Sequence, residues 1–167
     1  MKKTPKLIII RGPSGAGKSS VAKALKDQAK RPTVLISVDQ IRNLFSDQAR
    51  PGHQASKNMT LDNALFGLKR EYDVILEGIL NTKTHQSMVG GLFKIHPTEN
   101  YIFYLEVSFE ESLRRHNMRP ERVDFGEREM KEWRDYTSPM GLSNEVMIPE
   151  TSSLEESIKT IQKTAGI

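Results

Sequence analysis

The sequence predicts an α/β fold in which a five-stranded parallel sheet lies between two layers of helices. Short runs of apolar, often β-branched residues alternate along the 167-residue chain with longer segments of helical periodicity. Apolar runs of this kind are typical of strands buried on both faces, and their alternation with helices favours a parallel sheet. Because the length suits one domain, we expect residues 1–167 to form a single αβα sandwich.

Five segments are expected to form the strands. The first three are almost continuous apolar runs, and glycine follows the first and the third, where a strand would end. The fourth carries aromatic and β-branched residues, which favour strands, and the fifth is short. In chain order they are Lys6–Arg11, Thr33–Val38, Asp73–Glu77, Asn100–Val107 and Val146–Ile148.

Helices are expected in the segments between and after the strands, where apolar residues recur at helical spacing. One helix begins at Lys18 and a short one at Asp39. Pro51 with Gly52 interrupts the chain, and Pro120 ends the helix before it. The remaining helices are expected over Ser56–Arg70, Thr84–Lys94, Phe109–Asn117, Glu127–Tyr136 and Leu154–Lys163.

The composition excludes several classes of protein. Apolar residues make up 37% and charged residues 28%, which is ordinary for a globular domain, and the absence of cysteine excludes disulfides, thiolate zinc sites and cysteine nucleophiles. No apolar run reaches the ~20 residues of a membrane span, so we expect a cytoplasmic protein without a membrane partner. The net charge of +4 suits an enzyme that handles ATP, and leaves nucleic-acid binding as an alternative.

The most specific motif is a glycine-rich loop between the first strand and the first helix. It reads Gly12-Pro-Ser-Gly-Ala-Gly-Lys-Ser19 and matches G-x-x-x-x-G-K-[ST] without a mismatch. Glycines let backbone N–H groups approach phosphate oxygens, and the helix adds its positive end. Lys18 is expected to contact the β- and γ-phosphates as a catalytic residue, and Ser19 to ligate Mg²⁺. The expected nucleotide-binding residues are Gly12, Pro13, Ser14, Gly15, Ala16, Gly17, Lys18, Ser19 and Ser20.

On this motif the chain resembles the small P-loop kinases of the nucleoside-monophosphate-kinase type. Within them it is most similar to the branch of gluconate kinase-like, chloramphenicol phosphotransferase-like, zeta-toxin-like and polynucleotide 5′-kinase-like proteins. The resemblance covers nearly the whole chain. It implies a P-loop NTPase sheet with strand order 2-3-1-4-5, ATP and Mg²⁺ as ligands, and a short arginine-bearing lid at about residues 115–130.

The acceptor side is expected where the second and third strands end, because ligands of open parallel sheets bind outside the carboxyl ends of strands. The resemblance implies that Asp39 is the catalytic base and that Arg42 binds the acceptor; alternatively, Asp39 caps a helix and Arg42 lies on a solvated helix face. Glu77 ends an apolar strand in a pattern similar to Walker B. It would orient a magnesium-bound water or contact the acceptor, or else be an ordinary polar residue at a strand exit.

Several further residues are weaker candidates. Arg50, His53 and Lys57 fall where relatives recognise acceptors, although solvated loop residues explain them as well. Asn81 is a candidate next to Glu77. Two histidines, His85 and His96, lack the spacing of a metal site and are interpreted as structural, and Trp133 is expected to pack in the core.

The segment from Glu111 to Arg122 concentrates arginine and leads into the expected lid. By resemblance, Arg115 and Arg119 are catalytic phosphate clamps, and their i, i+4 spacing places them on one helical face. Arg122 is a further candidate, and Arg114 is expected to face away. The alternative is a surface helix in which the arginines pair with Glu110, Glu111 and Glu121.

The function expected from these residues is transfer of the γ-phosphoryl group of ATP to a hydroxyl of a small-molecule acceptor. One alternative is a polynucleotide 5′-hydroxyl kinase, which the positive charge favours but for which no aromatic-interleaved basic groove is evident. Another is a nucleotide-binding protein without kinase turnover, although the guanine-reading N-K-x-D motif of GTPase switches is missing. The acceptor, the oligomeric state and the biological role are not determined by these patterns.

Overall fold

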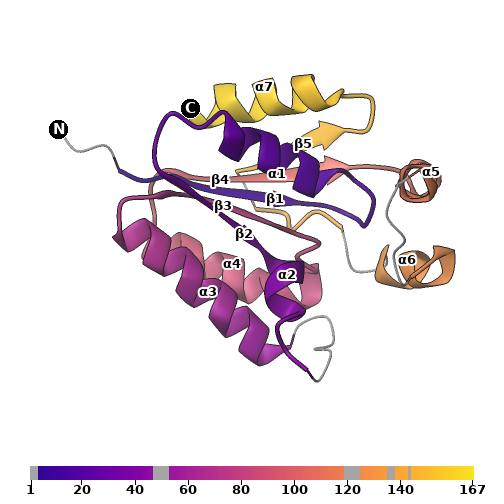
Figure 1. The fold of residues 1–167 in the computed structure, drawn as a ribbon, viewed down its shortest axis with the longest axis horizontal. Coiled ribbons are helices and arrows are strands. Elements are labelled where there is room, and N and C mark those ends of the chain that lie inside the picture. The colour runs from indigo at the N-terminus through magenta and orange to yellow at the C-terminus, as the bar shows by residue number, and fades with distance from the viewer. Residues whose placement is uncertain (1–3, 47–52, 119–124, 135–137, 143) are drawn as a thin grey trace.

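The computed structural model describes residues 4–46, 53–118, 125–134, 138–142 and 144–167 and shows a three-layer α/β/α sandwich (Figure 1). The central sheet has five parallel strands in the order β2-β3-β1-β4-β5. The fold class and the strand order expected from the sequence are both confirmed. The strands are β1 (Leu7–Arg11), β2 (Thr33–Ser37), β3 (Asp73–Gly78), β4 (Asn100–Glu106) and β5 (Glu145–Pro149).

Helices cover both faces of the sheet, and two more lie beyond the carboxyl ends of the strands (Figure 1). On one face are α3 (Gln54–Lys69) and α4 (Thr82–Ile95), with the short α2 (Val38–Arg42) beside α3. On the other face are α1 (Lys18–Asp27) and α7 (Leu154–Ala165). Beyond the strand ends are α5 (Phe109–Asn117) and α6 (Glu127–Arg134).

The central strand β1 explains how the sheet divides the core. Its five residues are all buried, because helices cover both faces. Side chains alternate along a strand, so Leu7 and Ile9 join the apolar cluster under α3 and α4, whereas Ile8 and Ile10 join the cluster under α1 and α7. The two clusters thus pack on both faces of β1, whose carboxyl end leads into the phosphate loop.

The start of the short helix differs from the sequence-based expectation. β2 ends at Ser37, and Val38 already belongs to α2. Ser37 has an extended backbone and its hydroxyl accepts a hydrogen bond from the Gln40 N–H at 3.5 Å, so Ser37 is the N-cap of α2. The alternative in which Asp39 caps this helix is therefore wrong. The pattern Ser-x-x-Gln is the signal for this cap.

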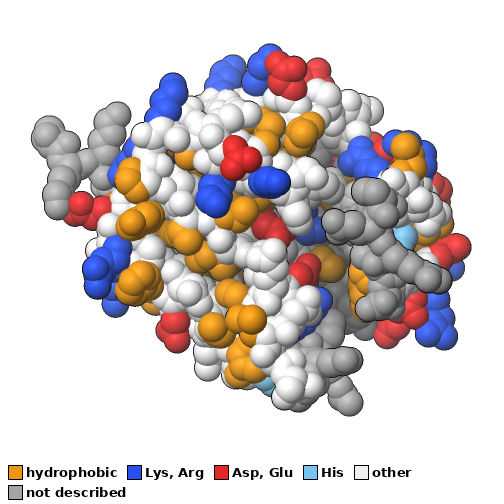
Figure 2. All heavy atoms as spheres, in the orientation of Figure 1, with side chains coloured by type: hydrophobic (Ala, Val, Ile, Leu, Met, Phe, Trp, Pro, Cys, Tyr) orange, Lys and Arg blue, Asp and Glu red, His pale blue; other side chains and the backbone are white. Residues whose placement is uncertain are grey.

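Other element boundaries shift by a few residues. α3 and α4 each begin two residues earlier than expected, and α7 ends two residues later. On the face shown in Figure 2, hydrophobic side chains gather over α3 and the neighbouring edge of the sheet, among charged ones. Met59, Phe66 and Tyr72, at and after α3, are among the large apolar residues that remain exposed.

Candidate active site

The glycine-rich loop between β1 and α1 is packed against two neighbouring segments. Gly12 and Gly15 have positive φ angles of 149° and 83°, a region that residues with a side chain rarely adopt. A Cβ on Gly12 would lie 2.7 Å from the Leu105 carbonyl oxygen, and one on Gly15 would lie 2.5 Å from that of Ser112. Glycine is therefore required at both positions, because backbone atoms of β4 and α5 leave no room for a Cβ there.

The backbone N–H groups at the end of this loop are open to a ligand. α1 has no side-chain N-cap, since Gly17 occupies that position, and its first turn has no acidic residue. Within the described part of the chain, the N–H groups of Gly17, Ser19 and Ser20 donate no hydrogen bond. Together with the positive end of the helix, these donors fit the phosphate groups of a nucleotide.

Lys18 lies over the same loop. Its side chain is buried, and its Nζ donates a hydrogen bond to the Pro13 carbonyl oxygen at 2.7 Å. Pro13, Ser14 and Ala16 form the turn over which this ammonium group lies. The ammonium is thus held against the backbone of the phosphate loop itself. Ser20, in α1, is exposed next to this loop.

Ser19 and Glu77 meet at the start of α1. The Ser19 hydroxyl donates to Glu77 Oε2 at 3.2 Å, across 58 positions of sequence. Glu77 is 3% exposed and lies in β3, directly beside β1. A hydroxyl and a carboxylate side by side at a phosphate site are oxygen groups of the kind that hold Mg²⁺ or its waters. The structure therefore brings together the two residues to which the sequence assigned metal and acceptor contacts.

Asp39 and Arg42 lie in α2, at the same rim of the sheet. Asp39 Oδ1 is 3.0 Å from Arg42 Nη2, and both side chains are partly exposed. The backbone register pairs Ser37 with Glu77, so α2 starts next to the carboxylate that contacts Ser19. A carboxylate and a guanidinium are therefore available to an acceptor beside the phosphate loop.

Arg115 joins α5 to the phosphate loop. Its guanidinium donates to the Ala16 carbonyl at 3.2 Å and to the Glu150 carbonyl at 3.1 Å, and it pairs with Glu111 at 2.6 Å. Arg114 also pairs with Glu111 but is 58% exposed, so it faces away from the loop. The two arginines hold the pKa of the Glu111 carboxyl at about 2, through hydrogen bonds from Arg114 first and then Arg115.

Part of the expected lid lies outside the described residues. This applies to Arg119 and Arg122, and also to Glu121. Arg114 fits the alternative of a surface helix whose arginines pair with glutamates, because its contact is with Glu111. Arg115 does not fit it fully, because its guanidinium also contacts the loop backbone at Ala16. Arg50 likewise lies outside the described residues.

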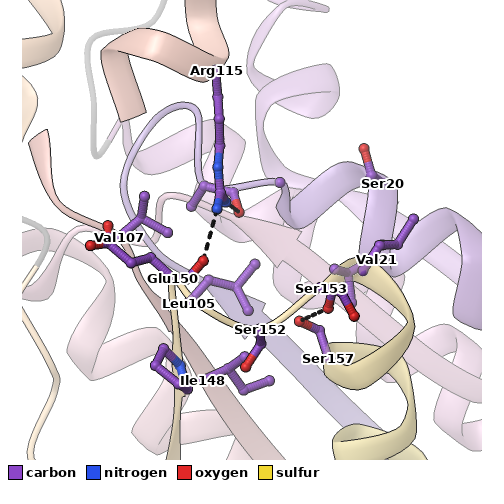
Figure 3. A pocket seen from close by; sticks show the side chains of 14 residues that line it. Ser20, Val21, Leu105, Val107, Arg115, Ile148, Glu150, Ser152, Ser153 and Ser157 are labelled. Atoms are coloured by element: carbon purple, nitrogen blue, oxygen red, sulfur yellow. Dashed lines mark hydrogen bonds between the residues drawn. The ribbon is translucent and has the colours of Figure 1, made fainter. Parts of the chain in front are cut away.

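A cavity of about 320 Å³ lies beside the phosphate loop (Figure 3). Arg115 extends into it from above and points at the Glu150 backbone, and Ser153 caps α7 on the opposite side. Its wall combines apolar side chains from α1, from the end of β4 and from β5 with hydroxyls from α1, the β5–α7 connection and α7, namely Val21, Leu105, Val107, Ile148, Ser20, Ser152 and Ser157. A flat heteroaromatic group could pack against the apolar side chains and hydrogen-bond to the hydroxyls.

Most of the chain matches a known protein family in sequence. Residues 7–140 match the AAA domain family (AAA_33), a segment that runs from β1 to the residues before β5. The chain belongs to the AAA domain family. No curated protein is detectably similar to this AAA domain in sequence.

Solved structures similar to this AAA domain include several kinases. A gluconokinase from Sinorhizobium meliloti 1021 has a TM-score of 0.72 at 19% identity, over 98% of this chain and 93% of that one. A sugar kinase from Janibacter sp. HTCC2649 has a TM-score of 0.77 at 13% identity, covering 98% and 95%. The Mycobacterium tuberculosis APS kinase CysC, in complex with AMPPNP and APS, has a TM-score of 0.70 at 14% identity, covering 98% and 99%. The AAA domain thus has the fold of P-loop kinases.

Over the residues that the structure describes, no cluster of three or more His, Cys, Asp or Glu side chains is arranged to hold a metal ion. Also among those residues, none of the helices is long and apolar enough to cross a membrane.

Sequence reasoning missed the polar pair of Arg11 and Glu145, whereas it named Asn81 as a candidate site residue and interpreted His85 as structural. Arg11 is completely buried at the end of β1 and pairs with Glu145. His85 is buried in the first turn of α4, and Asn81 is the N-cap of that helix, accepting from the Lys83 N–H. Asn81 thus has a capping role, and Asn at a helix start was the available signal.

The remaining aromatic and histidine candidates have partners. Trp133 is partly buried and packs against the Phe125 ring at 4.9 Å, beside α5 and away from the sheet. His96 Nε2 is 2.9 Å from the Pro5 carbonyl oxygen, and His53 packs edge-on against Phe45.

Proposed function

We propose that this AAA domain is an ATP-dependent kinase, which transfers the γ-phosphoryl group to a hydroxyl of a small-molecule acceptor. The observation that carries the proposal is the contact between Ser19 and Glu77 directly beside the open N–H groups of the phosphate loop. A loop that only packed against its neighbours would not need a buried carboxylate at this point.

The loop residues Gly12–Ser20 would bind the triphosphate of ATP, with Lys18 moving from the Pro13 carbonyl to the β- and γ-phosphates. Ser19 and Glu77 would hold the Mg²⁺ that arrives with the nucleotide, directly or through water. That ion supplies neutralisation of phosphate charge. The adenine would occupy the cavity of about 320 Å³ between α1 and the β5–α7 connection.

Asp39 would accept the proton of the acceptor hydroxyl. The acceptor oxygen then forms a bond to the γ-phosphorus, the bond from that phosphorus to the β–γ bridging oxygen breaks, and ADP leaves with the electron pair. Arg42 would hold the acceptor beside Asp39, with which it already pairs at 3.0 Å. Arg115 would neutralise charge on the transferred group, because its guanidinium already reaches the loop backbone.

We further propose that the described chain works as one catalytic domain whose lid spans about residues 115–130, with Arg119 contributing a second phosphate contact. This lid would begin within the last residues of α5, where Arg115 contacts the phosphate loop and the Glu150 carbonyl. Closure would exclude water and so limit hydrolysis of ATP.

Binding of ATP and turnover can be tested separately. Isothermal titration calorimetry should detect Mg·ATP binding to the wild type and its loss in Lys18→Ala. The control Lys23→Ala removes an exposed lysine of the same helix and should bind normally. ADP release is then measured with sugars, sugar acids, nucleosides and oligonucleotides as acceptors. Labelling of an oligonucleotide 5′-hydroxyl would favour the polynucleotide kinase instead, and no Mg·ATP binding would overturn the proposal.

A nucleotide-binding protein without turnover would bind Mg·ATP but release no ADP with any acceptor, and Asp39→Asn tests whether Asp39 takes part in turnover. If Asp39 is the base, this variant should bind Mg·ATP like the wild type but release ADP at least ~100-fold more slowly with the accepted compound. Equal rates for Asp39→Asn and wild type would show that Asp39 is not the base.

A further inference from the structure

A second group of polar side chains lies where the first turns of α3 and α4 meet. Lys57, in the first turn of α3, donates its Nζ to the Thr84 carbonyl of α4 at 3.2 Å. The Thr84 hydroxyl lies 2.9 Å from His85 Nδ1. Both helices begin at the carboxyl rim of the sheet, near α2, which carries Asp39 (Figure 1). This group, Lys57, Thr84 and His85, therefore borders the proposed acceptor side.

His85 is buried, but one of its two ring nitrogens has no hydrogen-bond partner among the described residues. Only 6% of it is exposed, and its Nε2 forms no hydrogen bond with any residue that the structure describes. Burial lowers the pKa of His85 to about 4, and the charges of Lys57 and Arg42 lower it as well, whereas the interaction of the ring with the Asn81 backbone carbonyl and the charge of Asp39 raise it. The imidazole is therefore neutral at pH 7, and Nε2 can hydrogen-bond a ligand without carrying charge.

The positive charge of Lys57 is not neutralised by its bond to a carbonyl. Across the described ranges of the chain, no carboxylate lies within ion-pair distance of its Nζ. The first turns of α3 and α4 both contribute the positive ends of helix dipoles, and neither contains an acidic residue. The site next to Asp39 thus favours a negatively charged group.

Building on the kinase function proposed above, we propose that Lys57 and His85 form the acceptor subsite, and that the acceptor carries an oxyanion group beside its reactive hydroxyl. A carboxylate, a phosphate or a sulfate has the required chemistry. Lys57 pairs with the oxyanion and His85 Nε2 hydrogen-bonds the same molecule, which leaves the hydroxyl to face Asp39. His85 is then a binding residue and not only part of the packing under α4.

The test uses the full chain saturated with Mg·AMPPNP, so that the phosphate loop is occupied. Inorganic phosphate, sulfate and acetate are titrated separately by calorimetry, which distinguishes the kinds of oxyanion. At least one should bind saturably to the wild type, and Lys57→Met should weaken that binding at least ~10-fold, as expected for a lost charged hydrogen bond. Lys69→Met, at the exposed far end of the same helix, is the matched control and should bind like the wild type.

The role of His85 is tested by a pair of variants. His85→Phe should weaken anion binding several-fold, whereas His85→Gln keeps a hydrogen-bonding group and should retain most of it. Melting curves confirm that each variant is folded, and Lys57→Gln replaces Lys57→Met if the latter is not. Absence of saturable anion binding in the loaded wild type, or undiminished binding in the Lys57 variant, overturns this inference alone. Failure to bind Mg·AMPPNP overturns the kinase proposal first.

Discussion

Arg11 and Glu145 form an ion pair in which both side chains are almost completely buried, with Arg11 Nη1 2.7 Å from Glu145 Oε1. Arg11 also donates to the Leu80 and Ser138 carbonyls, and its guanidinium lies 5.0 Å from the centre of the Tyr104 ring. The pair therefore joins the end of β1, one residue before the phosphate loop, to the start of β5. Leu80 has a positive φ of 45°, a strained conformation that its bond to Arg11 helps to maintain.

We expect Glu145→Ala to lower the free energy of unfolding by about 3–5 kcal/mol, because it leaves the Arg11 guanidinium buried without its partner. The Met140 and Gly141 N–H groups also lose their acceptor. Urea unfolding followed by circular dichroism measures the change. Glu155→Ala, which breaks an exposed ion pair with Lys159, should leave the midpoint unchanged. A shift of equal size in both variants would contradict the expectation.

Glu77→Gln should weaken the dependence of nucleotide binding on magnesium. The amide keeps the size of the side chain and can still accept from Ser19, but it lacks the charge that favours a divalent cation. We expect the apparent affinity for Mg²⁺ in the presence of ATP to fall at least ~10-fold, measured by titrating Mg²⁺ against a fixed ATP concentration. The matched control is Glu106→Gln, an exposed carboxylate at the end of β4. An unchanged Mg²⁺ midpoint for Glu77→Gln would exclude this role.

Arg115→Met should weaken ATP binding by about 10-fold, because the variant loses charged hydrogen bonds to the Ala16 and Glu150 carbonyls at the wall of the cavity proposed for adenine. Arg114→Met provides the comparison, since Arg114 pairs with the same glutamate but is largely exposed. Calorimetric titration of both variants with ATP gives the ratio. If the two variants lose affinity equally, the effect comes from Glu111 and not from the loop contacts.

His85 should make the folded state less stable in mild acid. Its pKa is about 4 in the folded protein and about 6.5 when unfolded, so the unfolded chain binds the proton more readily between these values. The contribution of neutral His85 is present above pH 6.5 and is lost as the pH falls toward 4. The loss between pH 7 and pH 5 is about 2 kcal/mol of unfolding free energy.

Urea unfolding at pH 5, 6 and 7 measures this loss, because carboxylates remain ionised over that range. His85→Gln has no proton to bind, so its stability should fall by about 2 kcal/mol less than that of the wild type between pH 7 and pH 5. The nearby charged groups, Lys57, Arg42 and Asp39, are present in both proteins. Parallel pH profiles would show that His85 is protonated as easily in the folded state as in the unfolded one.

Sites formed by residues that are adjacent in the sequence could be predicted from the sequence pattern alone. The loop from Gly12 to Ser19 is one example, because its glycines, its lysine and its helix start are contiguous. Glu77 could be predicted as a candidate, since it ends an apolar strand. The Ser37 cap also had a local signal, because Gln40 follows three positions later. This signal was overlooked because Val38 was assigned to the second strand and not to the helix.

Long-range contacts could not be predicted in this way. Arg11 and Glu145 are separated by 134 positions, and Arg115 and Ala16 by 99. An arginine at the end of a strand is expected to be exposed, because most arginines are. The sequence does not show which distant segment covers it. His85 likewise shows no local pattern, and its burial depends on how α3 and α4 pack at the sheet rim.

The amino-acid sequence by itself determined the αβα fold, the strand order through the resemblance, and the phosphate loop, since periodicity and a contiguous motif are properties of short segments. Only the tertiary structure decided which side chains meet at the sheet rim: Ser19 with Glu77, Arg115 with the loop backbone, and Lys57 with the turn that carries His85. The physical reason is that parallel strands joined by helices bring their carboxyl ends together from distant positions, and the register and packing that set those neighbours depend on the whole core.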